Sequence, residues 1–500
     1  MFSKQSKIDI NIIARLNQEL GFFLKNYDIT IDSRKANAAT IFCAYPGTVV
    51  DGRDFILSAI KNGCNVILYE EINSKISADI MQNKDITLIK IANLQLYVGY
   101  IAALKHGNIA NQSYNIAVTG TNGKTSISYW LNQVYTKLQK KAGLIGTLGA
   151  GIYPNIVYNN MTTPDPITLQ DTFSNFANKN VDMVVMETSS HAIHQGRING
   201  IEFKSAIFTN LTQDHLDYHL TMENYYQAKK DLFYWQNLEN AIINVDDKYG
   251  MRLYEELSGV VSNKNLQIMT YGINHGDVRA SNVRVAISGT KFDLSYNNET
   301  ISIIVGIIGK FNVYNILAIT CQLIIDGYNL SRIKEILTSI TPVNGRMDAI
   351  INKNKPLIVV DFSHTPDSLE NAILTLKEIE HRGKLYCVFG CGGNRDKLKR
   401  PIMGEIASRL ADVVIVTSDN PRFEEPNEII DNIVVGIKDQ KYIRIEDRHE
   451  AIKYAIENAS SNDIVLIAGK GHEDYQEIEG IKHHFSDLLI AHDLIQNKKG

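Results

Sequence analysis

The sequence predicts an α/β protein of three domains, of which the last is Rossmann-like, and three observations favour this fold class. Strands that are apolar almost throughout alternate with helical segments, a pattern typical of parallel sheets covered by helices on both faces. One glycine-rich loop stands between such a strand and a helix. In addition, loops rich in Gly, Asp, Asn or His follow the strands of the last two domains, where open α/β sheets bind ligands.

The domain boundaries follow from the places where these patterns change. Turn-rich sequence gives way to a longer helical segment after an N-terminal domain of residues 1–93. The central domain, residues 94–341, carries alternating strands and helices and then a β-rich stretch at 267–308. The alternation restarts in the C-terminal domain, residues 342–500, and a chain of 500 residues agrees with about three domains.

Composition narrows the classes of function. A formal net charge of −4 provides no broad basic surface, so we expect no nucleic-acid partner. The five cysteines are scattered without a CxxC pair or a zinc-like spacing, which fits a reducing compartment. No apolar run approaches the roughly 18 residues of a membrane span, and the N-terminus lacks a signal-like apolar segment. We therefore expect a soluble protein of the cytoplasm without a membrane partner.

The glycine-rich loop has the context of a phosphate-binding P-loop, because it links the strand IAVT to the helical sequence SISYWLNQVYTKL. Backbone N–H groups and the helix N-terminus attract an anion there. Lys124 can reach the β- and γ-phosphates of ATP, and Thr125 can bind Mg²⁺ through its hydroxyl. The loop is shorter than the general pattern, since residue 118 is valine. The predicted ATP-binding residues of this central P-loop ATPase domain are Gly120, Thr121, Asn122, Gly123, Lys124, Thr125 and Ser126.

Two other strand ends carry candidate metal ligands. Glu187 ends an apolar strand, and His215 lies in the aspartate-rich loop TNLTQDHLDYH after another strand. A carboxylate at a strand end can hold a metal or a metal-bound water. Taken alone, Glu187 could equally cap a helix, and a single histidine is usually structural.

Six segments in order along nearly the whole chain resemble the Mur ligase family, the ATP-dependent amide-forming enzymes of peptidoglycan precursor synthesis. These segments are TGTNGKTS, METSSH, TNLTQDHLDYH, GKFNVYN, NGRMD and DFSHTPDSL. A second set of strings is similar to those of the members that add meso-diaminopimelate to UDP-N-acetylmuramoyl-L-alanyl-D-glutamate. This set consists of DSR, TTPD, YYQAKKDLF, GCGGNRDKLKRP, DNPR and GKGHE.

The resemblance implies a mechanism and assigns roles to residues. ATP would phosphorylate the D-glutamyl carboxyl group of the nucleotide substrate, and the amine of the amino acid would attack the acyl phosphate. The implied catalytic residues are Lys124, Lys229 and His215, with Lys229 carbamylated by CO₂ on a helix that Thr221 caps. The implied Mg²⁺ ligands are Thr125, Glu187, His215 and the Lys229 carbamate. Asn315 and Arg346 would complete the ATP site, and the C-terminal domain, with Asp361 and His364 on its first strand-end loop, would close over it.

The resemblance also assigns the two substrate sites. The implied UDP-substrate-binding residues are Ile31, Ser33, Thr48, Val49, Val50, Thr162, Thr163, Ser189, Gln195 and Arg197. The implied amino-acid-binding residues are Arg395, Asp419, Asn420, Pro421, Arg422, Gly469 and Glu473. Diaminopimelate differs from lysine by a carboxylate on its distal carbon, and the guanidinium of Arg422 can grip such a group with two hydrogen bonds. We therefore expect Arg422 to stand unpaired in a closed pocket whenever lysine takes the place of diaminopimelate.

Four positions depart from the pattern of the family. Phe362 and Ser363 stand where Tyr-Ala is common, Asp348 where Glu is common, and Met161 where Asn is frequent. These departures leave the class of enzyme unchanged and concern only local contacts.

Three alternatives remain open on the sequence. A related ligase could add L-lysine or another diamino acid, or glutamate to folates, although folate ligases are not expected to carry DNPR together with GKGHE. A P-loop NTPase switch should carry a guanine-reading NKxD motif, which NVDD at 244–247 does not match. A binding module with a relic loop would not be expected to retain together the residues Lys124, Thr125, Glu187, Lys229 and His215.

Overall fold

The computed structural model describes residues 8–48, 50–73, 76–159, 161–259, 266–379, 383–438 and 442–497. Their contacts divide the chain into two compact units. Unit 1 comprises Met1–Thr119, Leu138–Ala206 and Gln227–Glu239, and unit 2 comprises Gly120–Lys137, Ile207–Tyr226 and Asn240–Gly500. The predicted domain boundaries at residues 93 and 341 stay predictions, and each unit is described by itself below.

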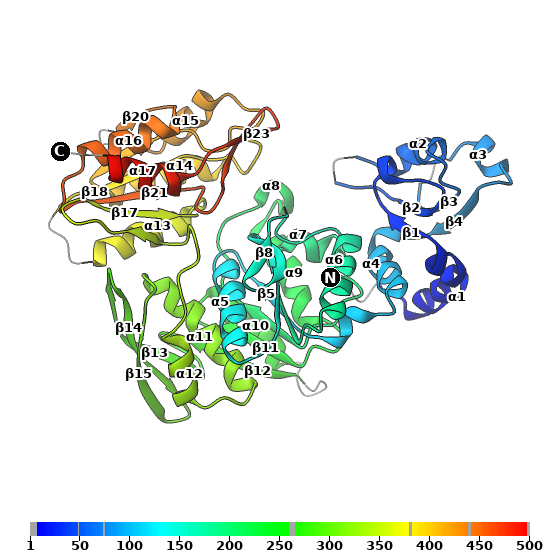
Figure 1. The fold of residues 1–500 in the computed structure, drawn as a ribbon, viewed down its shortest axis with the longest axis horizontal. Coiled ribbons are helices and arrows are strands. Elements are labelled where there is room, and N and C mark those ends of the chain that lie inside the picture. The colour runs from blue at the N-terminus through cyan, green and yellow to red at the C-terminus, as the bar shows by residue number, and fades with distance from the viewer. Residues whose placement is uncertain are drawn as a thin grey trace. The chain divides into compact units, whose positions relative to one another are not determined.

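Unit 1 begins with a four-stranded parallel sheet in the order β1-β2-β3-β4 (Figure 1). Alternate residues face opposite sides of a strand, so Ile41 and Cys43 pack under α1 and α4, while Phe42 and Ala44 pack under α2 and α3. The elements are α1 Ile10–Asn26, β1 Asp28–Thr30, η2 Ser33–Lys35, β2 Thr40–Ala44, η3 Gly52–Phe55, α2 Ile56–Lys61, β3 Val66–Glu70, α3 Ala78–Gln82, β4 Thr87–Ile91, α4 Leu94–Lys105 and η4 Ile109–Gln112.

The rest of unit 1 contains the strands β5, β9, β6, β7 and β8 as neighbours in that order. β5, β9 and β6 run parallel, whereas β7 and β8 extend the sheet as an antiparallel hairpin that the sequence did not indicate. The elements are β5 Tyr114–Thr119, β6 Ala142–Gly146, β7 Gly149–Ile152, β8 Asn155–Val157, α6 Pro166–Asn178, β9 Met183–Glu187, α7 Ser190–His194 and η5 Asp231–Tyr234. Two elements straddle the units, β10 Ser205–Phe208 and α9 Met222–Lys230.

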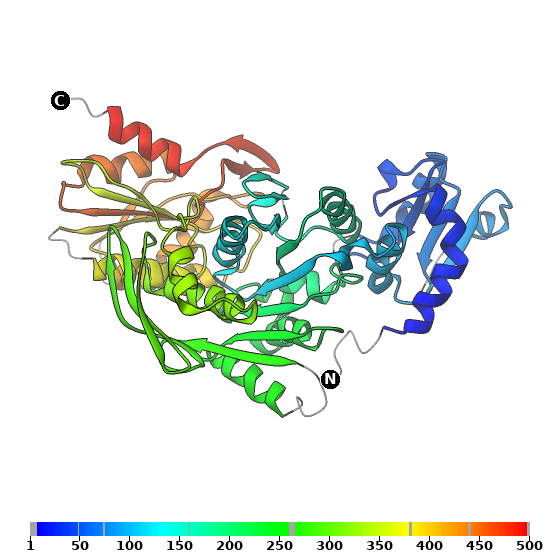
Figure 2. The ribbon, with the colours of Figure 1, turned by 60° about the horizontal axis from the view of Figure 1, so that its bottom comes forward.

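Unit 2 holds the helix that follows the glycine-rich loop and the β-rich stretch. β11, β12 and β13 pair in parallel, β13 to β15 form an antiparallel ribbon, and α11 and α12 pack against that ribbon (Figure 2). The elements are α5 Lys124–Lys137, α8 Leu216–His219, β11 Asn240–Asn244, α10 Lys248–Ser258, β12 Gln267–Gly272, β13 Val278–Ala286, β14 Gly289–Tyr296, β15 Glu299–Val305, α11 Lys310–Ile325 and α12 Leu330–Leu337. The predicted β-rich stretch at 267–308 is therefore confirmed, and α11 follows it directly.

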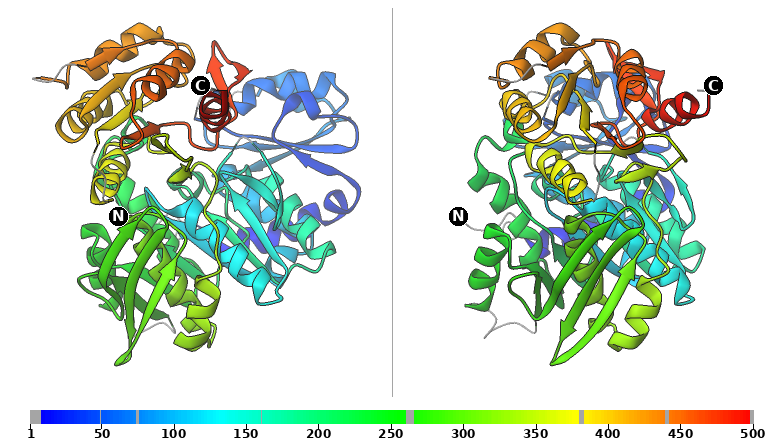
Figure 3. Two further views of the ribbon diagram at one scale, coloured as in Figure 1. Left: turned by 60° about the vertical axis from the view of Figure 1, so that its left-hand side comes forward. Right: turned by 90° about the vertical axis from the view of Figure 1, so that its left-hand side faces the viewer.

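The C-terminal part of unit 2 is a six-stranded sheet in the order β16-β17-β21-β18-β19-β20, parallel except for β16. Helices cover both faces (Figure 3): α13, α14 and α15 lie over Leu466, and α16 and α17 over Val465 and Ile467. The elements are β16 Asp348–Ile350, β17 Leu357–Asp361, α13 Pro366–Glu378, β18 Leu385–Phe389, α14 Lys399–Leu410, β19 Val413–Val416, α15 Pro426–Val434, β20 Tyr442–Arg444, α16 Arg448–Asn458, β21 Ile464–Ala468, β22 Tyr475–Ile478, β23 Ile481–His484 and α17 Asp487–Asn497.

These sheets confirm the predicted α/β class with a Rossmann-like C-terminal part. Each apolar run that the sequence marked as a strand is a strand, and the functional loops follow the strand ends as expected. Among the described helices, none is long and apolar enough to cross a membrane.

Gly99 explains how one helix of unit 1 packs. It lies inside α4, where a Cβ would stand 2.2 Å from the carbonyl oxygen of Asn199. We expect Gly99→Ala to destabilise unit 1 by about 1–3 kcal/mol through overpacking, read as a lower unfolding temperature. The control is Gly21→Ala in α1, where no atom lies within 4 Å of the added Cβ and a gain of up to about 1 kcal/mol is expected. Equal behaviour of the two variants would contradict this account.

Candidate active site

The phosphate loop needs glycine at two positions, because the backbone there has positive φ angles and neighbouring atoms leave no room for a Cβ. Gly120 has φ +145° and Gly123 has φ +88°, values that side chains disfavour. A Cβ at Gly120 would stand 1.8 Å from Thr209 Oγ1, and one at Gly123 would stand 2.4 Å from Asn315 Oδ1. The backbone of the phosphate loop therefore packs closely against the predicted ATP-binding residue Asn315 and against the loop that follows β10.

The loop after β10 supports the phosphate loop through hydrogen bonds. The Thr209 hydroxyl donates to the Asn122 carbonyl at 2.6 Å, and the Asn122 N–H donates to Asn210 Oδ1 at 2.9 Å. The hydroxyl of Thr121 donates to the carbonyl of Thr212 at 3.2 Å. The segment that contains the candidate ligand His215 thus also fixes the shape of the P-loop.

Two cations lie at this loop. The Lys124 ammonium donates to the carbonyls of Gly120 and Thr121, each at 2.8 Å. The Arg346 guanidinium donates to the hydroxyl of Thr125 at 3.1 Å. Both predicted contacts to ATP are therefore positioned beside the backbone N–H groups that would cradle phosphates.

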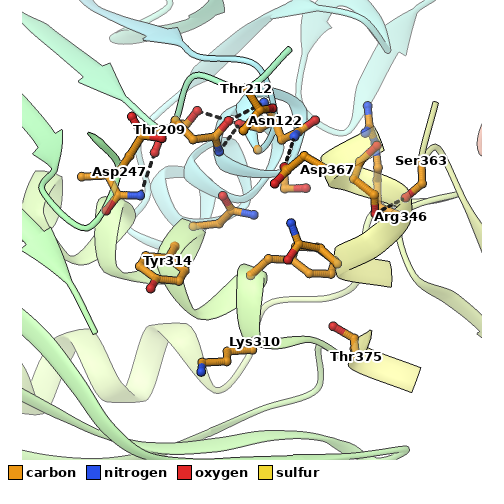
Figure 4. A pocket seen from close by; sticks show the side chains of 18 of the residues that line it. Asn122, Thr209, Thr212, Asp247, Lys310, Tyr314, Arg346, Ser363, Asp367 and Thr375 are labelled. Carbon is orange, nitrogen blue, oxygen red and sulfur yellow. Dashed lines mark hydrogen bonds between the residues drawn. The ribbon is translucent and has the colours of Figure 1, made fainter. Parts of the chain in front are cut away.

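A cavity of about 460 Å³ adjoins the phosphate loop, a volume in the range of small-molecule sites (Figure 4). Its walls come from the P-loop with Asn122, from α11 with Lys310 and Tyr314, and from α13 with Asp367 and Thr375. Asn122 Nδ2 donates to Asp367 Oδ2 at 2.7 Å, and both residues line the cavity (Figure 4). Aromatic and polar side chains such as Tyr314 and Asn315 line the cavity next to the phosphate loop.

The turn between α12 and β16 presents Arg346 to this cavity. Asp361, at the end of β17, accepts a hydrogen bond from the N–H of Met347 at 2.7 Å and one from the hydroxyl of Ser363. Burial raises the pKa of Asp361, and these donors and the Arg346 charge act against that shift. The Arg346 guanidinium lies 4.3 Å from the ring centroid of Phe362. Both departures at 362–363 thus have structural uses, since one stacks on Arg346 and the other donates to Asp361.

The other two departures lie elsewhere. Asp348 accepts a hydrogen bond from the N–H of Gly345 at 3.1 Å and so closes the turn that carries Arg346. Met161 is 41 % exposed, and its backbone N–H lies 3.4 Å from Asn159 Oδ1.

A cluster of charged and titratable groups surrounds the predicted ligand His215. Its Nε2 lies 3.2 Å from Asp214 Oδ2. Burial works against ionisation of Asp214, but His215 and the Lys399 cation hold the pKa of that carboxyl below its usual range. Burial, with the Lys399 cation, lowers the pKa of His364 to about 4, so His364 is neutral at pH 7. His215 therefore faces a carboxylate that is ionised at pH 7.

The predicted residues for the muramoyl-dipeptide gather at the end of β9 in unit 1. The Thr163 hydroxyl donates to the Glu187 carbonyl at 2.8 Å and accepts the Ser189 N–H at 3.1 Å. Arg197 donates to the Thr163 carbonyl at 3.0 Å and to Gln195 Oε1 at 2.7 Å. The carboxylate of Glu187 accepts both the N–H and the hydroxyl of Thr147, at 2.8 and 3.0 Å, and Thr162 shares the same hydroxyl at 3.1 Å.

The predicted uridine and diphosphate residues lie in the N-terminal sheet region of unit 1. Ser33 is buried at the start of η2, Ile31 is half-buried, and Thr48 and Val50 are exposed. Val49 lies outside the described residues. The assignment of these residues to the uridine and diphosphate groups stays a prediction.

Lys229 is not the solvated cation that its spacing alone would favour. It lies near the C-terminal end of α9 and is 1 % exposed. Thr221 caps that helix as expected, because its hydroxyl accepts the N–H of Asn224 at 3.1 Å. Lys229 and Glu187 belong to unit 1, whereas Thr125 and His215 belong to unit 2, and their grouping around Mg²⁺ stays a prediction.

The predicted amino-acid-binding residues meet where β19 and β21 end. Asn420 Nδ2 donates to Glu473 Oε2 at 2.9 Å. Gly469 has φ +123°, and a Cβ there would stand 2.6 Å from Asp419 Oδ2. Pro421 is buried beside them, and Arg395 is exposed. Two segments separated by about fifty residues thus form one polar site.

Arg422 corrects one expectation. It has φ +54°, which costs a non-glycine residue free energy and is held by backbone hydrogen bonds to Glu477 and Glu479. Its side chain is 18 % exposed and pairs with Glu477 Oε2 at 3.2 Å, while it also donates to the Gly393 carbonyl at 2.8 Å. Arg422 therefore has a carboxylate partner within the chain, so replacing diaminopimelate by lysine would not leave it unpaired.

Sequence reasoning missed several residues of these sites. Asp367 and Lys310 line the cavity, and Lys470 lies buried between Asn420 and Glu473. Asp367 and Lys470 fall inside the strings DFSHTPDSL and GKGHE, so their place beside strand ends was the available signal. Lys310 falls inside the string GKFNVYN, whose match to the family was the available signal.

Three family models match the chain. They describe the Mur ligase family catalytic domain at residues 26–106, the Mur ligase middle domain at 118–323 and the Mur ligase glutamate ligase domain at 345–471. The chain belongs to the Mur ligase family, and it is an ATP-dependent ligase that forms amide bonds.

Individual relatives agree with this assignment. The chain is 40 % identical over 481 residues to the UDP-N-acetylmuramoyl-L-alanyl-D-glutamate–2,6-diaminopimelate ligase of Chromobacterium violaceum, covering 96 % of each chain. It is 42 % identical over 474 residues to the ligase of the same name from Neisseria meningitidis serogroup B, covering 94 % of each. A solved structure of a ligase with this name is 33 % identical, with a TM-score of 0.66 over 94 % of this chain and 95 % of that one.

Lys124 provides a test of the phosphate loop. We expect Lys124→Met to lower kcat for ATP-dependent ligation about 10²- to 10³-fold, because a preorganised cation at the transferring phosphate is lost. ADP release measures the effect. The control is Lys137→Met at the other end of α5, where the ammonium donates to the Ser339 hydroxyl at 2.6 Å and an effect within about twofold is expected. Comparable losses in both variants would contradict the assignment.

Proposed function

We propose that this ligase joins meso-2,6-diaminopimelate to the D-glutamyl residue of UDP-N-acetylmuramoyl-L-alanyl-D-glutamate, in the cytoplasm, as a step of peptidoglycan precursor synthesis. The observation that carries the proposal is that relatives about 40 % identical over 94–98 % of this chain bear that activity in their names. The meeting of the DNPR and GKGHE loops at one polar site supports it, since a doubly zwitterionic amino acid needs both charges in its pocket.

ATP would lie in the cavity beside the phosphate loop, with its phosphates at Lys124 and Arg346. The reaction brings an anionic carboxylate to an anionic triphosphate, so the work of the site is mainly positioning and neutralisation of charge. Attack by the D-glutamyl carboxylate on the γ-phosphorus forms the acyl phosphate and releases ADP. Attack by the amine of the amino acid then forms the amide and releases phosphate.

Mg²⁺ fits the predicted ligands, because it prefers oxygen donors and Thr125 and Glu187 offer a hydroxyl and a carboxylate. Thr147 orients the buried Glu187 carboxylate through two hydrogen bonds. The roles of His215 and of the Lys229 carbamate belong to the same proposal. When bound, Mg²⁺ would neutralise charge on the phosphates of ATP. The described residues contain no group of three or more His, Cys, Asp or Glu that would hold a metal by itself.

The nucleotide substrate would contact the residues gathered at the end of β9, with Arg197 available to a carboxylate or phosphate. The amino acid would lie at the ends of β19 and β21. There Asp419, Asn420, Gly469 and Glu473 would meet its ammonium groups, and Arg422 and Arg395 its carboxylates. An L-lysine-adding enzyme is the alternative that the structure favours most, since Arg422 already has a carboxylate partner in Glu477.

Lys229 tests the carbamate. A buried lysine that reacts with CO₂ becomes an anion that can bind Mg²⁺, so we expect Lys229→Ala to abolish ligation almost completely and a short carboxylic acid to restore part of it. The control is Lys230→Ala, which removes the neighbouring ammonium that lies 5.3 Å from the Tyr234 ring centroid and should leave ligation near the wild-type rate. Full ligation by Lys229→Ala without added acid would exclude the carbamate.

Arg422 tests the choice of amino acid, and the same assay tests the proposed function. ADP release is measured with UDP-muramoyl dipeptide and a panel of amino acids. We expect the wild type to prefer meso-diaminopimelate over L-lysine by about 10⁴-fold, because a site built around a polar group rejects the analogue that lacks it. Arg422→Ala should raise the diaminopimelate KM and reduce this preference, with the KM values for ATP and the nucleotide substrate nearly unchanged.

The control for this variant is Arg444→Ala in the same domain, whose ion pair with Asp431 at 2.5 Å is half-exposed. It should leave the preference intact. Equal use of lysine and diaminopimelate by the wild type would refute the proposed substrate. An unchanged preference in Arg422→Ala would refute the role of Arg422 alone.

A further inference from the structure

Lys470 is a buried cation inside the predicted amino-acid pocket that none of the assigned roles uses. It follows β21, and its side chain is 0 % exposed. Its ammonium donates to Asn420 Oδ1 and to Glu473 Oε2, each at 3.0 Å, and lies 5.4 Å from the ring centroid of Tyr475. Two of the three N–H donors of the ammonium thus bond to side chains of the protein, and its charge also lies near an aromatic ring. Lys470 therefore serves the protein rather than a substrate.

The bonds of Lys470 set the orientation of the Asn420 amide. Asn420 Oδ1 accepts from Lys470 and also from the N–H of Glu477 at 2.9 Å. With both donors on Oδ1, the amide must turn Nδ2 towards Glu473, where it donates to Oε2 at 2.9 Å. Glu473 Oε2 thus receives two donors, and no donor from the described residues reaches Oε1. One carboxylate oxygen is left in a fixed direction for an external cation.

We propose that Lys470 is a positioning residue for the amino-acid pocket: its buried ammonium holds Asn420 and Glu473 in the orientation in which Glu473 receives an ammonium group of the incoming amino acid. This inference rests on the proposed function, because it deepens the assignment of Glu473 to the amino acid. It adds no catalytic group, since Lys470 acts only through Asn420 and Glu473.

The frame around these side chains does not depend on Lys470. Arg448 is fully buried, pairs with Asp487 at 2.7 Å, and donates to the carbonyls of Ser418 at 3.3 Å and Ala468 at 2.9 Å. These carbonyls precede the two loops of the pocket, so Arg448 anchors both loop backbones. Loss of the Lys470 ammonium should therefore release side chains while the loops keep their place.

Electrostatics support the same role. Burial raises the pKa of Glu473, and the nearby Asp419 raises it further, while Lys470 acts against both. Two charges from other elements also act on Glu473. One is Asp419 in the loop after β19, and the other is Arg448 at the start of α16. Without Lys470 the pKa of Glu473 rises, so the carboxylate is present only at higher pH. Recognition of an ammonium group would then improve as the pH rises, since it needs the ionised form.

The test is Lys470→Met, which keeps the length of the side chain and removes its charge. We expect the KM for diaminopimelate at pH 7 to rise about tenfold to a hundredfold, as for the loss of hydrogen bonds to a charged group. The KM for ATP and for the nucleotide substrate should stay within about twofold. The diaminopimelate KM of the variant should fall with rising pH relative to that of the wild type, because only the ionised Glu473 accepts an ammonium group. A change of stability alone would not produce this selective, pH-dependent effect.

The matched control is Lys482→Met. Lys482 lies 3.9 Å from the centroid of the same Tyr475 ring but is exposed on β23. It should leave the diaminopimelate KM within about twofold. An equal rise of this KM in both lysine variants would overturn the inference, because the shared aromatic contact would then be the cause.

A double-mutant cycle covers the case in which Lys470→Met leaves a buried charge and fails to fold. The pair Lys470→Met with Glu473→Gln removes both charges. If Lys470 acts through Glu473, the pair should show nearly the same diaminopimelate KM as Glu473→Gln alone. A further rise of tenfold or more in the pair would overturn the inference.

The outcomes separate this inference from the proposed function. A wild type that ligates diaminopimelate, together with a Lys470→Met variant of unchanged diaminopimelate KM, would overturn the inference and leave the function standing. A wild type that uses another amino acid would refute the proposed substrate. The same KM comparison with that amino acid would then decide the role of Lys470, because every candidate substrate brings an ammonium group.

Discussion

The burial of the parallel strands on both faces is the constraint on which the rest of the structure depends. A strand such as β21, with Leu466 packed on one face and Val465 on the other, has no room for a polar side chain until it ends. Functional groups therefore begin at the carboxyl ends of the strands: the phosphate loop after β5, the TNLTQDH loop after β10, and GKGHE after β21. Because these loops are short and start from rigid strands, their backbones hold phosphate-binding and polar groups in defined places.

This constraint explains why much of the fold could be predicted from the sequence. Continuous apolar runs bounded by polar residues identify strands, and the glycines at 120 and 123 are needed for positive φ and for close approach. The roles of Lys229 and Arg422 could not be derived in this way, because the same residues at the same spacing also suit a solvated face. The resemblance supplied those roles, and the burial of Lys229 agrees with its assignment.

Contacts between segments that lie far apart in the chain could not be predicted from the sequence. The Arg422–Glu477 pair joins residues 55 apart, and the Asn122–Asp367 bond joins residues 245 apart. No periodicity links such positions, since each depends on how strands are ordered in a sheet and on which helix reaches a loop. The antiparallel hairpin β7–β8 was missed because its strands, GAGI and NIV, are too short to form the apolar run that marks the others.

Three of the carboxylates that line the cavity beside the phosphate loop differ in what they bond to. Burial raises the pKa of Asp247, Asp361 and Asp367 alike. The fold uses two of them: Asp247 caps α10 through the N–H groups of Tyr249 and Gly250, and Asp361 holds the N–H of Met347. Asp367 instead bonds to the side chain of Asn122 on the phosphate loop. A bond between two side chains can be exchanged without moving backbone, so Asp367 is the carboxylate that can yield its place when an anionic triphosphate occupies the loop.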